Sequence, residues 1–118
     1  MVEDVTYQPD RGDFIWLDFD PQSGTEQAGR RPALVVSPRD FNIATGLAAV
    51  CPITNTATGS KFEVPIPRGV KLSGVIQSYQ FRTLDWISRN AAFHAKANND
   101  LMWEVVGRIE AILCIEAG

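Results

Sequence analysis

A polar loop between two apolar segments carries the residues best suited to chemistry. Residues 18–38 read DFDPQSGTEQAGRRPALVVSP, and the loop ends in the adjacent pair Arg30 and Arg31. A guanidinium is always charged and matches the geometry of a phosphate, so either arginine could bind one. The alternative is a structural ion pair with Asp18 or Asp20 on the preceding strand. Spacing alone favours this alternative.

Other polar side chains could act beside an arginine. Glu26 and Gln27 lie in the same loop, and Glu26 could serve as a general base or contact a nucleobase. As a solvated loop carboxylate it would do neither, and spacing favours that reading. Thr54 and Asn55 follow an apolar run, where their side chains could position a phosphate or cap a turn.

A strip of polar and aromatic residues occupies a later segment of high β-propensity. On one face of a strand such side chains could read nucleobases by hydrogen bonding and stacking. They could equally form the solvated face of an antiparallel sheet. The residues are Gln77, Tyr79, Gln80 and Arg82.

No sequence motif for a metal or a cofactor is present. The only histidine, His94, has no cysteine or carboxylate at ligand spacing, so no metal site and no cofactor are predicted. One reaction suits arginine, threonine and glutamate without either: attack of a ribose 2′-hydroxyl on its own phosphate. The substrate supplies the nucleophile, and the protein needs only to orient it, stabilise negative charge and move protons.

The elements that would position these residues are mostly short strands. Apolar alternation and turn signals predict strands over 14–20, 33–36, 47–54 (interrupted at Pro52), 62–66, 75–83 and 86–88, with a turn over 41–46. Apolar residues at three-to-four spacing predict a helix from about Asn99, capped by Asn98 or Asn99. This pattern favours a mainly β fold, either a compact barrel or a strongly twisted sheet.

Length and composition predict one domain over residues 1–118. Residues 1–11 are predicted to be a loose, acidic N-terminal arm. No apolar run is long enough to cross a bilayer or has the form of a signal peptide. Cys51 and Cys114 each lie in an apolar run, and we interpret both as reduced core residues of a cytoplasmic protein.

Charge is distributed unevenly along the chain. The net charge is −3, but residues 21–98 carry nine basic and four acidic residues. A basic middle between acidic ends could present a positive face to an anionic partner. Ordinary scatter over a solvated surface explains the counts equally well.

Taken together, these segments resemble the MazF/PemK family of toxin ribonucleases. The resemblance rests on GDFIWLDFDPQSGTEQAGRRPALVVSP, with its Gly-x-Glu-Gln-x-Gly loop and Arg-Pro step, and continues through CPITNT, QFRTLDW and EVVGRIEAIL. It extends from about Gly12 to Leu113, so residues 12–118 are identified as a toxin domain of this family.

The resemblance implies a fold and an activity. The fold would be an SH3-like antiparallel β-barrel with a C-terminal helix, as in CcdB and PemK, working as a homodimer. The activity would be metal-independent cleavage of single-stranded RNA at short sequences, which leaves a 2′,3′-cyclic phosphate and a 5′-hydroxyl. A cognate antitoxin with an acidic flexible tail would neutralise it.

The resemblance also implies roles for particular residues. Arg31 matches the family's catalytic arginine and Thr54 its active-site threonine. Glu26 and Gln27 match the loop Glu-Gln, with Glu26 or the substrate phosphate as general base. Residues assigned to RNA binding are Gln27, Asn55, Gln77, Gln80 and Arg82.

The chain departs from one branch of the family. The Kid/PemK branch carries a histidine before the loop glutamate and an Arg-x-Asp on the fifth strand. Thr25, Gln77 and Tyr79 stand at those places here, which indicates the MazF branch.

Two non-catalytic functions compete with this one. CcdB-type toxins share the fold and poison gyrase, but their Trp-Gly-Ile ending is absent from the C-terminal Ile115-Glu116-Ala117-Gly118. An SH3-like nucleic-acid-binding domain would bind RNA in a salt-dependent way without cutting it.

Overall fold

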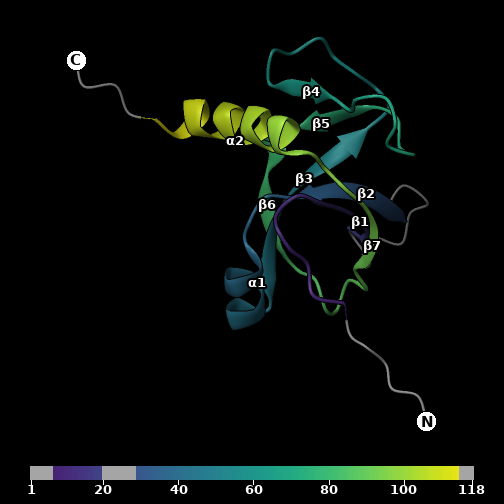
Figure 1. Ribbon diagram of the computed structural model, residues 1–118, viewed down its shortest axis with the longest axis vertical. Coiled ribbons are helices and arrows are strands. Elements are labelled where there is room, and N and C mark those ends of the chain that lie inside the picture. The colour runs from purple at the N-terminus through teal and green to yellow at the C-terminus, as the bar shows by residue number, and fades with distance from the viewer. Residues whose placement is uncertain (1–6, 20–28, 115–118) are drawn as a thin grey trace.

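An antiparallel sheet and a C-terminal helix make up the protein (Figure 1). The computed structural model describes residues 7–19 and 29–114. Within these ranges the elements are β1 (Asp13–Asp18), β2 (Arg30–Val35), α1 (Arg39–Thr45), β3 (Leu47–Thr54), β4 (Glu63–Pro65), β5 (Val75–Gln77), the 3₁₀-helix η2 (Ser78–Gln80), β6 (Arg82–Asp85), β7 (Ala92–Lys96) and α2 (Asn99–Leu113).

The sheet has seven strands among the described residues, in the order β4-β5-β3-β2-β1-β7, with β6 paired to β3. All recorded pairings are antiparallel. This confirms the predicted mainly β fold with a C-terminal helix. The closed SH3-like barrel is not confirmed, because the terminal strands β4 and β7 do not pair with each other.

Strand β3 is the centre of the sheet and has the predicted bounds. One of its edges pairs with β2, while the other pairs with β6 over Leu47–Val50 and with β5 over Ile53–Thr54. Pro52 lies in the gap between these last two ladders. A proline lacks the N–H that a sheet ladder needs, so the change of partner explains why β3 continues through it without the predicted interruption.

The strands β1, β2 and β3 are buried on both faces. One cluster contains Phe14, Leu34 and Cys51 with residues of α2, and the other contains Ile15, Ala33 and Val50. The alternate residues of each strand enter different clusters because successive side chains point to opposite faces.

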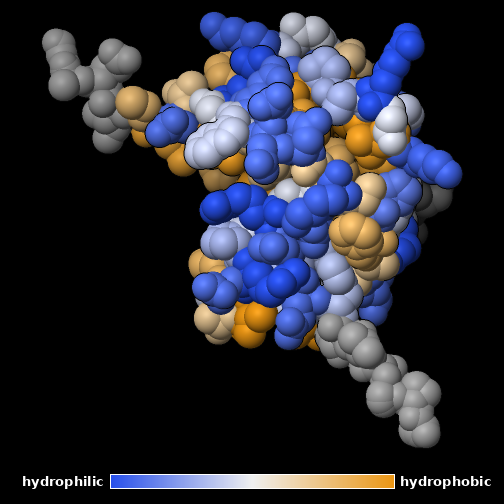
Figure 2. Space-filling model, viewed as in Figure 1, coloured by the Kyte–Doolittle hydropathy of each residue, from blue (hydrophilic) through white to orange (hydrophobic). Residues whose placement is uncertain are grey.

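Helix α2 packs on the sheet through its first half. Asn98 caps it by accepting the Leu101 N–H at 2.8 Å. Leu101, Met102 and Val105 are buried, whereas Trp103 is 75% exposed and Leu113 is 61% exposed. Figure 1 shows the C-terminal half of the helix projecting beyond the sheet, and Figure 2 shows hydrophobic residues exposed there.

Helix α1 replaces the turn predicted over 41–46. Asn42, a residue that favours turns, is fully buried, and its Nδ2 donates to the carbonyls of Pro9 and Ser37. Gly46 ends the helix with a left-handed φ of 74°. The carbonyl of Asn42 accepts the indole N–H of Trp86, which is 6% exposed. These long-range contacts leave no local signal in the sequence.

Two other sequence predictions were wrong, and one strand was missed. The segment 75–83 is interrupted by η2, where buried Ser78 donates to the Phe62 carbonyl, instead of forming one strand. Residues 86–88 form a turn, because Asp85 accepts the N–H groups of Ile87 and Ser88. Strand β7, which was not predicted, pairs with β1.

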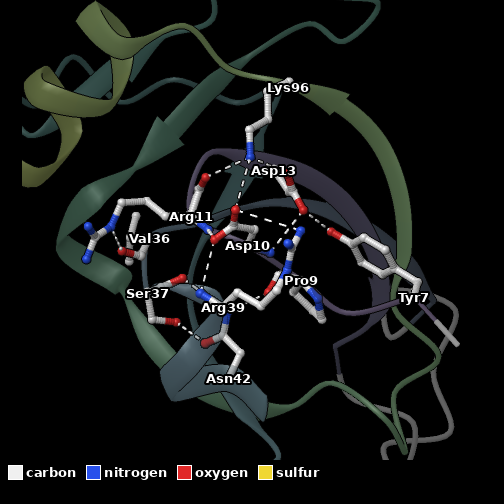
Figure 3. A network of polar contacts seen from close by, with 10 residues as sticks. All are labelled: Tyr7, Pro9, Asp10, Arg11, Asp13, Val36, Ser37, Arg39, Asn42 and Lys96. Atoms are coloured by element: carbon white, nitrogen blue, oxygen red, sulfur yellow. Dashed lines mark hydrogen bonds and ion pairs between the residues drawn. The ribbon is translucent and has the colours of Figure 1, made fainter.

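The N-terminal segment is packed over the part that the structure describes. Pro9 is buried, and the Asp10 carboxylate accepts the Arg39 backbone N–H at 3.0 Å. Figure 3 shows Asp13 at the centre of a polar network between Tyr7 and Lys96. The predicted loose arm is therefore wrong for residues 7–11, and residues 1–6 lie outside the described ranges. We keep the single domain over 1–118 as a proposal.

Two sequence interpretations concern single features. Both cysteines are free; Cys51 is buried as expected, but Cys114 is exposed because α2 has left the sheet where the helix ends. Among the described residues, no helix has the length and apolar character needed to cross a membrane.

The network in Figure 3 generates a stability prediction. Tyr7→Phe is expected to lower the free energy of unfolding by about 1–2 kcal/mol, because Asp13, only 3% exposed, loses a donor while it stays buried. Tyr79→Phe is the matched control, since its hydroxyl only accepts a 3.3 Å bond from Gln77 at the surface. Urea denaturation measures both variants, and equal losses would contradict a stabilising role for the Tyr7 hydroxyl.

The same hydrogen bond predicts a pH dependence. Burial, then the hydrogen bond and charge of Asp13, raise the pKa of Tyr7 above the ordinary value of 10.0. The stability that this raised pKa contributes is present below pH 10.0 and is lost as the pH rises above it. The wild type should therefore lose stability more steeply than Tyr7→Phe in alkaline urea titrations. Parallel curves would contradict this assignment.

Candidate functional site

The two adjacent arginines at the start of β2 have different surroundings. Arg30 pairs with Asp18, with 3.1 Å between Nη1 and Oδ1, and also donates to the carbonyl of Asn90. Asn90 Nδ2 donates to the same carboxylate at 2.9 Å. The hydrogen bond from Asn90, followed by that from Arg30, lowers the pKa of Asp18. The structural ion pair considered for either arginine thus belongs to Arg30.

The side chain of Arg31 is exposed and makes no hydrogen bond or ion pair with the described residues. It stands opposite Leu17 of β1. On the other side of β2, the last recorded pair with β3 is Ala33 with Pro52. An extension of this register by two residues, beyond the recorded ladder, would bring Arg31 opposite Thr54. Residues directly opposite in an antiparallel pair project to the same face, so the cation and the hydroxyl would then share one face.

A cleft of about 670 Å³ opens at this end of the strands. Among the described residues, it combines an indole, two hydroxyls and an amide with one cation. Its lining residues are Trp16, Pro32, Ile53, Thr54, Asn55, Lys71, Leu72 and Ser73. Arg31 directly precedes Pro32 but does not itself line the cleft, because successive side chains of a strand point to opposite faces. The cation of the lining is Lys71, and a cation and a hydroxyl at an open cleft are suited to binding a phosphate and stabilising negative charge on it.

Local hydrogen bonds orient the polar side chains of the cleft. Thr54 is half-buried, and its Oγ1 accepts the N–H of Thr56 at 3.1 Å. The hydroxyl hydrogen of Thr54 can then point toward a bound anion. Ser73 donates to Asn55 Oδ1 at 2.9 Å, which joins the loop between β4 and β5 to the end of β3.

Gly74 is a residue of this site that sequence reasoning missed. Its φ is +115°, and a Cβ there would lie 2.4 Å from the carbonyl oxygen of Thr54. The backbone of the loop can approach the end of β3 only because residue 74 has no side chain. The Ser-Gly pair at 73–74 signals a turn in the sequence, but it gives no information about what the turn packs against.

Glu63 is a second missed residue near the cleft. Its carboxylate is buried and accepts the backbone N–H groups of Thr58 and Gly59 and the hydroxyl of Thr58. The hydrogen bond from the Thr58 backbone is the main cause that lowers the pKa of Glu63. This carboxylate fixes the backbone at Thr58 and Gly59, in the segment that follows Asn55 of the cleft lining.

The remaining predicted residues are not gathered in the cleft. Gln77 stands opposite Glu63 on β4, and its Nε2 donates to the Tyr79 hydroxyl at 3.3 Å. Gln80 is exposed on η2. Arg82 is exposed on β6 opposite Val50, four residues before Thr54 along β3.

Two predicted site residues, Glu26 and Gln27, lie outside the described residues. Thr54 and Asn55 are thus the predicted residues that line the cleft, and the roles of all the predicted site residues remain predictions.

The close approach at Gly74 generates a stability prediction. Gly74→Ala is expected to lower the free energy of unfolding by about 2–4 kcal/mol, because it adds a clash with the Thr54 carbonyl to the strain of a positive φ. Gly69→Ala in the same loop is the matched control: its φ is +97°, but its Cβ meets nothing within 4 Å, so only about 1 kcal/mol is expected. Thermal unfolding compares the two, and equal losses would contradict the clash.

Comparisons with known proteins place the chain among toxins. Residues 10–113 match the family described as PemK-like, MazF-like toxin of type II toxin–antitoxin system. The endoribonuclease toxin MazF of Escherichia coli K12 is 45% identical over 85 residues, which cover 72% of this chain and 76% of that protein. Endoribonuclease PemK of Escherichia coli is 36% identical over 108 residues, which cover 88% and 81%.

Solved structures agree with these matches. A MazE–MazF crystal structure from Deinococcus radiodurans contains a chain with 46% identity and a TM-score of 0.84, covering 91% of this chain and 97% of that one. The resemblance noted in the sequence is therefore confirmed. The chain belongs to the PemK/MazF family of toxins of type II toxin–antitoxin systems.

Proposed function

We propose that this protein is the toxin of a type II toxin–antitoxin pair and an endoribonuclease that cleaves single-stranded RNA without a metal ion. By cutting messenger RNA in the cytoplasm it inhibits translation. Membership of the family and the endoribonuclease names of the relatives support this function. The observation that carries it is the β2–β3 register, whose extension by two residues would put Arg31 opposite Thr54, together with the cleft that Thr54 lines.

The reaction requires the protein to stabilise negative charge, donate a hydrogen bond and transfer protons. The 2′-oxygen of the substrate attacks the adjacent phosphorus, the bond from phosphorus to the 5′-oxygen breaks, and the products are a 2′,3′-cyclic phosphate and a 5′-hydroxyl. Arg31 stabilises the additional negative charge on the phosphate oxygens, and the Thr54 hydroxyl donates to one of them. Glu26 or the substrate phosphate takes the proton from the 2′-hydroxyl, and the 5′-oxygen gains a proton.

The structural role of Arg30 supports the assignment of Arg31. Arg30 is held by Asp18 and by the Asn90 carbonyl. This arrangement leaves Arg31 as the arginine of the pair that can bind a substrate phosphate. Asp18 and Asn90 also fix the start of β2, so the backbone of Arg31 is held beside Pro32 of the cleft.

The partners follow from the same family membership. MazE–MazF complexes are among the similar solved structures. For this chain we propose a homodimer and a cognate antitoxin whose acidic, flexible tail binds the basic surface. Gln27, Asn55, Gln77, Gln80 and Arg82 are proposed to contact RNA; of these, Asn55 lines the cleft.

The first test compares the two arginines. End-labelled single-stranded RNA is incubated in excess EDTA with wild type, Arg31→Ala and Arg30→Ala. Arg31→Ala should lose about 10²–10³-fold in cleavage rate with little change in melting temperature, because it removes charge stabilisation only. Arg30→Ala should melt earlier because Asp18 loses its cation, and its folded fraction should keep most of the activity.

Other outcomes of this assay would overturn parts of the proposal. Intact RNA with folded, antitoxin-free wild type would remove the ribonuclease and bring forward a non-catalytic toxin, with gyrase inhibition as the next assay. Cleavage that stops in EDTA would contradict metal independence. Equal loss of activity in both arginine variants at equal stability would contradict the division of roles.

A second test concerns the general base. Glu26→Gln should lower the cleavage rate and remove the acidic limb of its pH profile, since a carboxylate base must be deprotonated to act. The measurement is the single-turnover rate at saturating RNA over a range of pH. A variant with the wild-type rate and profile would leave the substrate phosphate as the base.

A further inference from the structure

His94 of β7 joins the cleft to the loop that forms its far wall. Trp16 Nε1 lies 3.3 Å from His94 Nδ1, and His94 Nε2 lies 2.9 Å from the backbone carbonyl oxygen of Lys71. The imidazole and the indole meet edge to face, with ring centroids 6.0 Å apart and planes at 87°. Trp16 and Lys71 both line the cleft, so His94 connects two of its sides from behind.

The partners of His94 determine its tautomer. An indole nitrogen only donates, so Nδ1 of His94 must accept from Trp16 and carry no hydrogen. A backbone carbonyl only accepts, so Nε2 must carry the hydrogen and donate to Lys71. The neutral imidazole therefore satisfies both neighbours at once. A phenylalanine could keep the edge-to-face packing but neither hydrogen bond.

The loop that contains Lys71 packs on the first apolar cluster through Ile66, Val70 and Leu72, but it has few other hydrogen bonds. Residues 66–74 between β4 and β5 contain no helix or strand. Their recorded hydrogen bonds run from the Ile66 N–H to the Gly74 carbonyl, from the Leu72 N–H to the Val70 carbonyl and from the Ser73 hydroxyl to Asn55 Oδ1. At Lys71 itself, the hydrogen bond comes from His94 Nε2 to the Lys71 carbonyl.

Lys71 has the properties of a phosphate-binding side chain. It is exposed, and it is the only charged residue among the described residues that line the cleft. It forms no ion pair with a carboxylate of the described part of the chain. A cation in an open groove is how single-stranded nucleic acid is commonly held along its backbone.

We propose that Lys71 binds a backbone phosphate of the RNA next to the one that reacts, and that His94 is a positioning residue that holds Lys71 at the cleft. This inference rests on the proposed function and adds a substrate contact to it. Lys71 makes its contact before and during the reaction alike, so its loss weakens RNA binding while the chemical step is retained.

The first experiment removes the charge of Lys71. Lys71→Gln is compared with Lys61→Gln, whose side chain is exposed over the Phe62 ring, 5.8 Å from its centroid, and outside the cleft. Binding of a 2′-O-methyl RNA that cannot be cut is measured against salt concentration. Lys71→Gln should weaken binding about three- to tenfold at low salt and flatten the log–log salt slope by about 0.7, as expected for one lost phosphate contact.

The second experiment tests whether His94 holds the loop of residues 66–74 in place. Hydrogen exchange in peptides from residues 66–74 should become faster in His94→Phe and stay slower in His94→Gln, because glutamine can still donate to the Lys71 carbonyl. In cleavage assays His94→Phe should raise KM about as much as Lys71→Gln with kcat within about twofold, and His94→Gln should recover part of the loss. A thermal unfolding scan of each variant serves as the control that it is folded.

The outcomes separate this inference from the proposed function. If the wild type cleaves RNA but Lys71→Gln and Lys61→Gln bind it equally, the phosphate contact is wrong and the ribonuclease stands. If His94→Phe leaves the exchange of residues 66–74 unchanged, the positioning role is wrong. If the wild type neither binds nor cleaves RNA, the proposed function and the Lys71 contact fail together, and the exchange data alone decide whether His94 holds the loop.

Discussion

Burial of β1, β2 and β3 on both faces is the constraint on which the arrangement of this molecule depends. Each of these strands supplies side chains to two apolar clusters, so their middle positions have no room for polar chemistry. A charged group placed there would lose its hydration without compensation. Polar side chains are therefore confined to the strand ends, and the cleft lies where β1, β2 and β3 expose Trp16, Pro32 and Thr54.

The ends of buried strands must also be held in register, and polar contacts from distant segments do this. Arg30 and Asn90 hold Asp18 at the end of β1, Glu63 fixes the chain after Asn55, and Gly74 lets a loop approach Thr54. None of these residues needs to touch a substrate. Their common effect is to hold the strand ends at which Thr54 and Asn55 line the cleft.

The sequence predicted the parts of this fold that depend on periodicity. The bounds of β3 and the start of α2 agree with the structure, because an apolar run ending in Thr54 and a three-to-four repeat after Asn98 are local signals. The helix α1 and the 3₁₀-turn at Ser78 were missed because Asn42 and Ser78 are held by distant carbonyls.

The candidate site was predictable to a smaller extent. Motif resemblance predicted roles for Arg31 and Thr54, and the structure adds that their strands, β2 and β3, pair with each other. Spacing could not distinguish Arg30 from Arg31, since that choice depends on Asn90, which is 60 residues away in the chain. His94, interpreted only as a residue without metal ligands nearby, has partners that no local pattern indicates.

The three tryptophans of this chain have unequal surroundings, and this has a spectroscopic consequence. Trp86 is 6% exposed in the core, Trp103 is 75% exposed on α2, and Trp16 is half-buried in the lining of the cleft. Their emission maxima should therefore separate, with Trp86 furthest to the blue and Trp103 furthest to the red. Once Trp103 is replaced by phenylalanine, intrinsic fluorescence becomes an optical probe of the cleft. A molecule bound in the cleft should change the emission of Trp16, whereas the emission of the buried Trp86 should stay constant.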